Sequence, residues 1–327
     1  MTTAAAPSPT PTAVLEARAL GHTYPNGHKA LDGVELSLGT GLFGLLGPNG
    51  AGKSTLMRIA CTLLVPTQGT MTVLGHDVTR ERREVRRLIG YLPQEFGAWR
   101  LHRTEEVLDT LARLSGLGPR RERRRRVAEV LESVGLEKVA DRKVKKLSGG
   151  MLRRLGVAQA MIHDPRVLIV DEPTVGLDPE ERMRFRQLMA RLGRDRTILL
   201  STHIVADLGG GCTEMALLDG GRIVFHGPPT GLLAQAAGRV FELTTTPALA
   251  DQVETSYEIV SRTGSSNGVR LRGVTGDGLP EDASVVETPT LEEAYIAFMA
   301  ARGRSDAARQ EGGDALAEEP DASEEEI

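Results

Sequence analysis

The sequence predicts an α/β protein built around a largely parallel sheet, because strand-like and helix-like segments alternate along most of the chain. From Val14 to about Gly227, short apolar runs typical of strands alternate with segments of helical periodicity. Aromatic residues make up only 3% of the 327 residues, so aliphatic side chains must fill most of the core. After Gly227 the alternation ends, and the remaining sequence predicts a small C-terminal α+β module.

The first buried strand is expected over residues 41–47, a run of Gly, Leu and Phe without a polar side chain. It leads into a helix on which Leu56, Ile59, Ala60 and Leu63 share one face at helical spacing. A buried strand that leads directly into an amphipathic helix is typical of a parallel sheet, whose strands are joined by helical crossovers.

Two amphipathic helices are expected in the middle of the chain, with no strand between them. Their apolar positions are Val107, Leu108, Leu111 and Leu114 in the first, and Val127, Val130, Leu131 and Val134 in the second. This interruption predicts an inserted helical subdomain over about residues 95–162. The Arg-rich stretch 119–126 could suggest a nucleic-acid or lipid site, but a solvated face of the second helix accounts for it better.

The sheet pattern then resumes with two aliphatic runs, residues 167–171 and 197–202. A hairpin follows, because residues 215–218 and 222–225 are separated by Asp219-Gly220-Gly221.

The last part of the chain has a helix with a clear start, at which Thr290 and Glu293 match a capping box. The two ends of the chain have too few apolar residues to form a core. We therefore expect a disordered leader (1–13), a main domain (14–235), a small accessory module (239–302) and an acidic disordered tail (303–327).

Composition and charge exclude several classes of protein. The formal net charge of −4 argues against nucleic acid as a partner, because phosphate-binding surfaces are usually basic. Two cysteines, Cys61 and Cys212, are too few for a disulfide framework and fit a reduced compartment. No run approaches the ~20 apolar residues of a membrane helix, and the N-terminal segment lacks the features of a signal peptide. We expect any role at a membrane to need a partner that spans it.

Residues 47–55 fit the phosphate-binding pattern G-x-x-x-x-G-K-[ST]. Glycines let successive N–H groups converge on a phosphate, and the N-terminus of the next helix adds a positive dipole end. Lys53 is expected to neutralise the β- and γ-phosphates of ATP, and the Ser54 hydroxyl to ligate Mg²⁺. A glycine-rich turn with an exposed lysine is the alternative, but the strand before it and the helix after it favour a nucleotide site. The expected ATP-binding residues of this P-loop are Gly47, Pro48, Asn49, Gly50, Ala51, Gly52, Lys53, Ser54 and Thr55.

Asp171 and Glu172 stand at the end of the aliphatic run 167–171 and are expected to belong to the same site. Asp171 would hold Mg²⁺ through a water, and Glu172 would orient or deprotonate the attacking water. On their own, two acidic residues at a strand end are usually just an exposed strand terminus. With the P-loop upstream, they predict a P-loop NTPase.

A further motif, Leu-Ser-Gly-Gly-Met at residues 147–151, completes a set that resembles the ATP-binding cassette (ABC) family. In order, the motifs are GPNGAGKST, GYLPQ, LSGGM, VLIVDEPTVGLDP and STH, and they span Gly47 to His203. One departure is Met151, where glutamine is commonest in the family. The resemblance implies the fold of an ABC cassette, with a mostly parallel sheet core, an antiparallel β portion and a helical subdomain.

The resemblance also implies roles for matched side chains. Tyr24 would stack on adenine, Gln94 would sense Mg²⁺ and the attacking water, and His203 would contact the γ-phosphate. Each has an ordinary alternative: a packed tyrosine, a strand-end amide, and a surface or core histidine. The catalytic residues implied are Glu172, His203 and Gln94, and the implied metal ligands are Ser54, Gln94 and Asp171.

A single cassette cannot enclose ATP in this family, so the resemblance implies a dimer with a second cassette and favours a homodimer over a heterodimer. Asp178 would cross the dimer interface. Ser148, Gly149 and Gly150 would complete the ATP site of the opposite protomer, with the N-terminus of their helix aimed at the γ-phosphate.

The expected function is hydrolysis of ATP, with Mg²⁺, to power a separate integral membrane permease from the cytoplasmic face of the cell membrane. The permease would be contacted near Gln94, Trp99 and Arg103. LSGGM followed by basic residues, and the closing segment 289–299, resemble a bacterial branch that exports drugs and lipids. A non-transport ABC ATPase that acts on a cytosolic macromolecule is the alternative; a single cassette and the lack of heptads argue against it.

Overall fold

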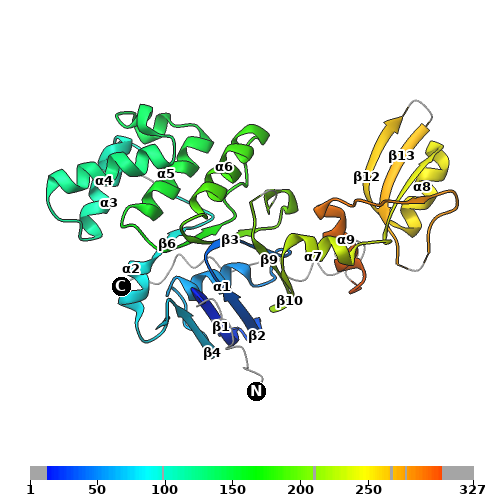
Figure 1. The fold of residues 1–327 in the computed structure, drawn as a ribbon, viewed down its shortest axis with the longest axis horizontal. Helices are drawn as coiled ribbons and strands as arrows, with labels where there is room; N and C mark the ends of the chain where they lie inside the picture. Colours follow the sequence, from blue (N-terminus) through cyan, green and yellow to red (C-terminus); the bar gives the residue numbers. More distant parts are fainter. Residues whose placement is uncertain (1–12, 98, 209–210, 266–267, 277, 304–327) are drawn as a thin grey trace, which may run out of the picture. The chain divides into compact units, whose positions relative to one another are not determined.

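The structure is a computed structural model that describes residues 13–97, 99–208, 211–265, 268–276 and 278–303 (Figure 1). It divides into two compact units, Met1–Pro228 and Pro229–Ile327. The sequence places the boundary at residue 235 instead, and the domain ranges stay a prediction. The leader expected over 1–13 and the tail expected over 303–327 lie, but for residues 13 and 303, outside the described residues.

A mostly parallel sheet forms the centre of the first unit, with the strand order β10-β9-β3-β8-β7-β6. Its strands are β3 (Gly41–Leu46), β6 (Ile89–Leu92), β7 (Val167–Asp171), β8 (Thr197–Thr202), β9 (Glu214–Asp219) and β10 (Arg222–Gly227). The neighbours are parallel except β9 and β10, which form the predicted hairpin. Every residue of β3, β7 and β8 is buried, which explains why these strands are almost wholly apolar.

A second, antiparallel sheet has the order β2-β1-β4-β5. Its strands are β1 (Leu15–Thr23), β2 (Lys29–Leu38), β4 (Gln68–Val73) and β5 (His76–Asp77). Helix α1 (Lys53–Ala60) shares one hydrophobic core with this sheet and with the central sheet. Leu63 was predicted on the buried face of α1, and this is wrong. The helix ends at Ala60, Thr62 adopts a positive φ of 61°, and Leu63 is exposed beyond it.

The predicted helical subdomain consists of α3 (Thr104–Leu114), α4 (Arg120–Ser133) and α5 (Gly149–Met161), with short 3-10 turns η1 (Glu137–Val139) and η2 (Val144–Lys146). The three helices pack on one another. The predicted apolar face of α4 is buried, but Leu114 was placed wrongly, because it is the last residue of α3 and is exposed. Outside the subdomain, α2 (Arg82–Leu88) precedes β6, and α6 (Pro179–Leu192) and η3 (Val205–Leu208) flank β8.

The second unit contains a sheet with the order β12-β13-β11-β14. Its elements are α7 (Pro229–Gln235), β11 (Val240–Thr245), α8 (Pro247–Ser256), β12 (Glu258–Ser265), β13 (Gly268–Val274), β14 (Ser284–Val285) and α9 (Leu291–Ala300). Phe241, Leu243 and Leu271 of the sheet form a small core with Ala250 and Val253 of α8. The predicted capping box at the start of α9 is confirmed, because Thr290 and Glu293 each bond the other's backbone N–H. None of the helices in the described part of the chain combines the length and apolar character needed to cross a membrane.

Candidate nucleotide site

The candidate site lies at the carboxyl edge of the central sheet. β3 ends at Leu46 and leads into the P-loop, β7 ends at Asp171, and β8 ends at Thr202. These strands are parallel neighbours, so the residues that follow them meet at one edge. Ligands of open α/β sheets bind at this edge. The sheet therefore brings together three segments that are far apart in the sequence.

The backbone of the P-loop approaches other backbone so closely that two positions accept only glycine. A Cβ on Gly47 would lie 2.2 Å from the carbonyl oxygen of Leu218. Gly52 has a φ of 103°, and a Cβ there would lie 2.3 Å from the carbonyl oxygen of Ala30. The loop is thus fixed against β9 and β2, and α1 begins directly after it at Lys53.

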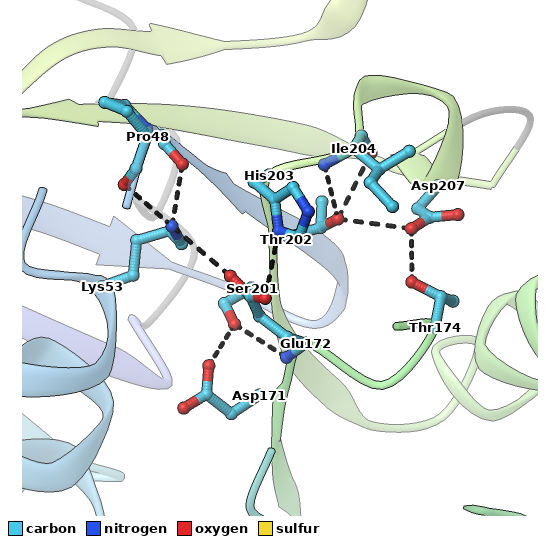
Figure 2. A network of polar contacts seen from close by, with 11 residues as sticks. Pro48, Lys53, Asp171, Glu172, Thr174, Ser201, Thr202, His203, Ile204 and Asp207 are labelled. Carbon is cyan, nitrogen blue, oxygen red and sulfur yellow. Dashed lines mark hydrogen bonds and ion pairs between the residues drawn. The ribbon is translucent and has the colours of Figure 1, made fainter. Parts of the chain in front are cut away.

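Lys53 lies within the site, and its side chain is only 5% exposed (Figure 2). Its Nζ donates to the carbonyl oxygens of Gly47 at 2.8 Å and Pro48 at 3.0 Å. Glu172 Oε1 is 3.5 Å away. Burial lowers the pKa of Lys53, while the carboxylates of Glu172 and Asp171 favour its charged form. The ammonium group is therefore held by oxygen atoms of the kind a phosphate would offer.

Glu172 holds its carboxylate between two cationic or polar partners. Oε1 faces Lys53, and Oε2 is 3.0 Å from Nδ1 of His203. An ionised carboxylate can only accept, so Nδ1 of His203 carries the hydrogen in this pair, which leaves Nε2 as the nitrogen for a ligand. The backbone of Glu172 has a φ of 41°, a left-handed conformation that costs a non-glycine residue of the order of 1–3 kcal/mol. A strained backbone thus aims the glutamate.

Ser201 connects the two acidic residues, and the sequence prediction did not single it out. Its hydroxyl donates to Asp171 Oδ1 and accepts from the backbone N–H of Glu172 at 3.0 Å (Figure 2). All three residues are buried. The available signal was its place in the STH motif, at the end of a strand expected beside the strand of Asp171.

Tyr24 and Gln94 each have one contact that bears on their predicted roles. The Tyr24 hydroxyl is 3.1 Å from the Thr55 hydroxyl on α1, so the ring lies beside the helix that follows the P-loop. Gln94 follows the end of β6 by two residues and is exposed. Its carbonyl oxygen accepts from Nη1 of Arg153 on α5 at 2.6 Å. The adenine and metal roles of Tyr24 and Gln94 stay predictions.

The signature segment, which is the LSGGM motif at residues 147–151, lies at the N-terminus of α5. Ser148 caps that helix by accepting from the backbone N–H of Met151 at 3.2 Å. Asp178 likewise caps α6, with its carboxylate accepting from Glu181 N at 2.9 Å. Helix α5 lies apart from α1 (Figure 1). The fold therefore gathers Lys53 with the acidic pair and leaves the signature helix elsewhere on the same chain.

The predicted metal ligands would suit magnesium only together with a bound nucleotide. The Ser54 hydroxyl, the Asp171 carboxylate and the Gln94 amide are hard oxygen donors, the type that Mg²⁺ prefers. Among the described residues, no group of three or more His, Cys, Asp or Glu side chains could hold a metal ion. A site of this composition fits an ion that takes its remaining ligands from phosphates and water.

Comparison with known proteins supplies the context of this arrangement. Residues 31–175 match the family described as ABC transporter. The daunorubicin resistance ATP-binding protein DrrA3 of Streptomyces coeruleorubidus is 34% identical over 287 residues, which cover 82% of this chain and 90% of that protein. The Nod factor export ATP-binding protein I of Cupriavidus metallidurans is 38% identical over 229 residues, 69% of this chain and 75% of that protein.

Solved structures are similar to about two thirds of the chain. The structure of cbiO1 from Clostridium perfringens, described as part of the ABC transporter complex cbiONQ, superposes with a TM-score of 0.63 at 26% identity. The matched region covers 68% of this chain and 91% of the cbiO1 chain. A dimeric ATP-binding cassette, solved in a post-hydrolysis state with ADP and Pi, has a TM-score of 0.59 at 26% identity and covers 65% and 98% of the two chains.

Proposed function

Because the chain belongs to the family of ABC transporter ATP-binding proteins, we propose that two copies of it hydrolyse ATP between them and drive a separate membrane permease. The observation that carries the proposal is the cluster of buried Lys53, Asp171 and Glu172 with the more exposed His203 at the carboxyl edge of the central sheet. Three separate segments of the chain bring these side chains together, and groups of this kind can bind phosphate and activate water.

The chemistry follows from the positions of these groups. Lys53 can exchange its bonds to the Gly47 and Pro48 carbonyls for bonds to the β- and γ-phosphates. Glu172 then accepts a proton from, or orients, the attacking water, and His203 contacts the γ-phosphate. Ser54, Asp171 and Gln94 would hold Mg²⁺, which when bound neutralises charge that develops on the phosphates.

A second copy is needed because one chain offers only half of the groups that enclose ATP. Ser148 and Gly149 are exposed at the N-terminus of α5, where backbone N–H groups and the helix dipole attract an anion. In a head-to-tail dimer, this segment and Gly150 would close the site of the partner, and Asp178 would lie at the interface. A homodimer needs no other chain, and a dimeric cassette among the similar structures supports this arrangement.

The permease is expected to dock near the end of β6 and the start of the helical subdomain. Trp99 is 45% exposed and Leu101 is 69% exposed in the segment between Gln94 and α3. Large apolar side chains exposed close together are typical of an interaction surface. Docking there would place the chain on the cytoplasmic face of the membrane. Relatives named for daunorubicin resistance and Nod factor export support an exporter of a drug-like or lipid-like substrate.

The decisive experiment compares the purified wild-type chain with Glu172→Gln. Turnover of Mg-ATP should fall by about 100-fold or more, because general-base catalysis contributes roughly 10²–10⁴-fold. ATP should still bind, and light scattering after size exclusion should detect an ATP-dependent dimer. Glu84→Gln is the matched control, since Glu84 is an exposed partner of Arg87 outside the site. Wild-type turnover by Glu172→Gln would show that the proposed role of this residue is wrong.

A further inference from the structure

Asp207 is a buried carboxylate that none of the roles above uses. It lies in η3, shortly after the strand that leads to His203, and is 5% exposed. An ionised carboxylate is costly to bury unless other groups bond to it. Within the described part of the chain, no lysine, arginine or histidine forms an ion pair with it. Its partners are instead neutral hydroxyl groups.

Two buried threonines bond to the same oxygen of this carboxylate (Figure 2). The Thr174 hydroxyl donates to Oδ2 of Asp207, and the Thr202 hydroxyl is 3.3 Å from that oxygen. The Thr202 hydroxyl also accepts from the backbone N–H of Ile204 at 2.9 Å. Asp207 therefore fixes both the segment with Thr174 and the turn that follows Thr202.

These two segments are the ones that carry the catalytic side chains. Thr174 is two residues after Glu172, and Thr202 immediately precedes His203. Glu172 and His203 meet at 3.0 Å on the other side of the same loops. The two segments are thus joined twice (Figure 2). Asp207 connects them through Thr174 and Thr202, and Glu172 and His203 contact each other directly.

The element that carries Asp207 is itself anchored to the rest of the unit. Leu208 packs closely on Gly44 of β3. A Cβ on Gly44 would lie 2.5 Å from a methyl group of Leu208. Nη1 of Arg186 on α6 donates to the Ala206 carbonyl oxygen at 2.5 Å. The short helix η3 is therefore anchored to β3 and α6 independently of its contacts with Thr174 and Thr202.

We propose that Asp207 is a positioning residue for hydrolysis, which sets the separation of Glu172 and His203 through Thr174 and Thr202. The inference rests on the proposed function, because it assigns a role toward the water-activating pair. Asp207 acts through these hydroxyls and needs no contact with ATP. A purely structural role would instead affect stability and leave the turnover of the folded protein unchanged.

The first test uses Thr174, which can lose its hydroxyl at nearly constant volume. Thr174→Val should lower kcat for Mg-ATP by about 10- to 100-fold, because displacing a catalytic group by about 1 Å costs about that much. KM and the Kd for ATP should stay within about 3-fold, since the P-loop is untouched. Thr174→Ser keeps the hydroxyl and should restore kcat. Melting temperatures show that the variants are folded under assay conditions.

The second test separates the shared contact from two independent effects. Asp207→Asn retains an oxygen that can accept from both threonines, so its kcat should stay near that of the wild type. Asp207→Leu removes the acceptor, and combining it with Thr174→Val should be no slower than the slower single variant, because residues acting through one contact are not additive. If Asp207→Leu does not fold, Thr174→Val and Thr174→Ser decide the question.

Three outcomes would overturn the inference: wild-type kcat in folded Thr174→Val, a Kd for ATP that weakens as much as kcat falls, or losses that multiply in the double variant. Failure of the proposed function looks different. There, the wild type itself would hydrolyse no more Mg-ATP than Lys53→Ala.

Discussion

The two halves of the expected ATP site differ in how far one chain completes them. Lys53, Asp171 and Glu172 are buried, and Ser201 and a close ion pair connect them. Ser148 is exposed and bonds to Met151 and Leu152 of its own helix. The strand-end half is therefore connected within one chain, whereas the signature half would, in the proposed dimer, be completed by the partner. Loss of the P-loop lysine in the first half should weaken ATP binding, whereas blocking the signature segment in the second half should lower turnover and leave ATP binding intact.

The largest effect is expected at Lys53. Lys53→Ala removes the one ammonium group in the P-loop and should weaken ATP binding by about 100-fold or more, as truncation of a buried charge partner typically does. Calorimetric titration with Mg-ATP measures this directly. Lys29→Ala is the matched control, because Lys29 pairs with Asp32 at the surface. Unchanged affinity in Lys53→Ala would remove the basis for treating the strand ends as the binding half.

A smaller effect, confined to turnover, is expected at Gly149. A Cβ there has no atom within 4 Å, so Gly149→Ala should fold and bind ATP normally. Its turnover should fall by about 10-fold or more, because the added methyl group would stand where the partner's nucleotide needs backbone donors. Gly150→Ala is a poorer choice, since its Cβ would lie 2.0 Å from the Glu181 carboxylate.

Mixing variants tests whether the halves come from different chains. A dimer of one Lys53→Ala chain and one Gly149→Ala chain has one site with both an intact P-loop and an intact signature segment. The mixture should therefore hydrolyse more Mg-ATP than the two variants measured apart. Turnover equal to their average would contradict a site shared between protomers.

The smallest effect concerns stability. Ser148→Ala removes the cap of α5 and should lower the free energy of unfolding by about 1 kcal/mol, the typical value for an N-cap. Thr290→Ala removes a similar cap from α9 in the second unit and should cost about the same. Urea unfolding curves of both variants give the comparison. A Ser148→Ala variant as stable as the wild type would mean that this hydroxyl has no capping role in solution.

The strand-end half was largely predictable because its residues sit in short contiguous motifs. The P-loop, the β7 strand with its acidic pair, and the STH segment each combine an apolar run with polar residues at its end. The parallel sheet then forces these ends together. Contacts between them could not be predicted in the same way. Ser201 bonds to Asp171 across 30 residues, and Asp207 to Thr174 across 33, and no local pattern encodes such a pair.

The second unit was harder to predict because its strands lack a strong pattern. Strand β11 begins with the buried residues Val240 and Phe241, but β12 has no buried residue, and β13 has exposed or half-buried arginines at alternate positions. Strand β14 consists only of Ser284–Val285, at the edge of the sheet. Antiparallel strands with one solvated face need few apolar residues, so composition alone does not reveal them.

The left-handed backbone at Glu172 has a consequence for how the protein can change over generations. Glycine would adopt this conformation without the strain that a side chain imposes. Replacement of Glu172 by glycine would relieve this strain but would leave the buried Lys53 ammonium without its carboxylate partner. Because the two effects oppose each other, selection for heat tolerance alone should not remove this glutamate, and its loss should mark lineages that have given up hydrolysis.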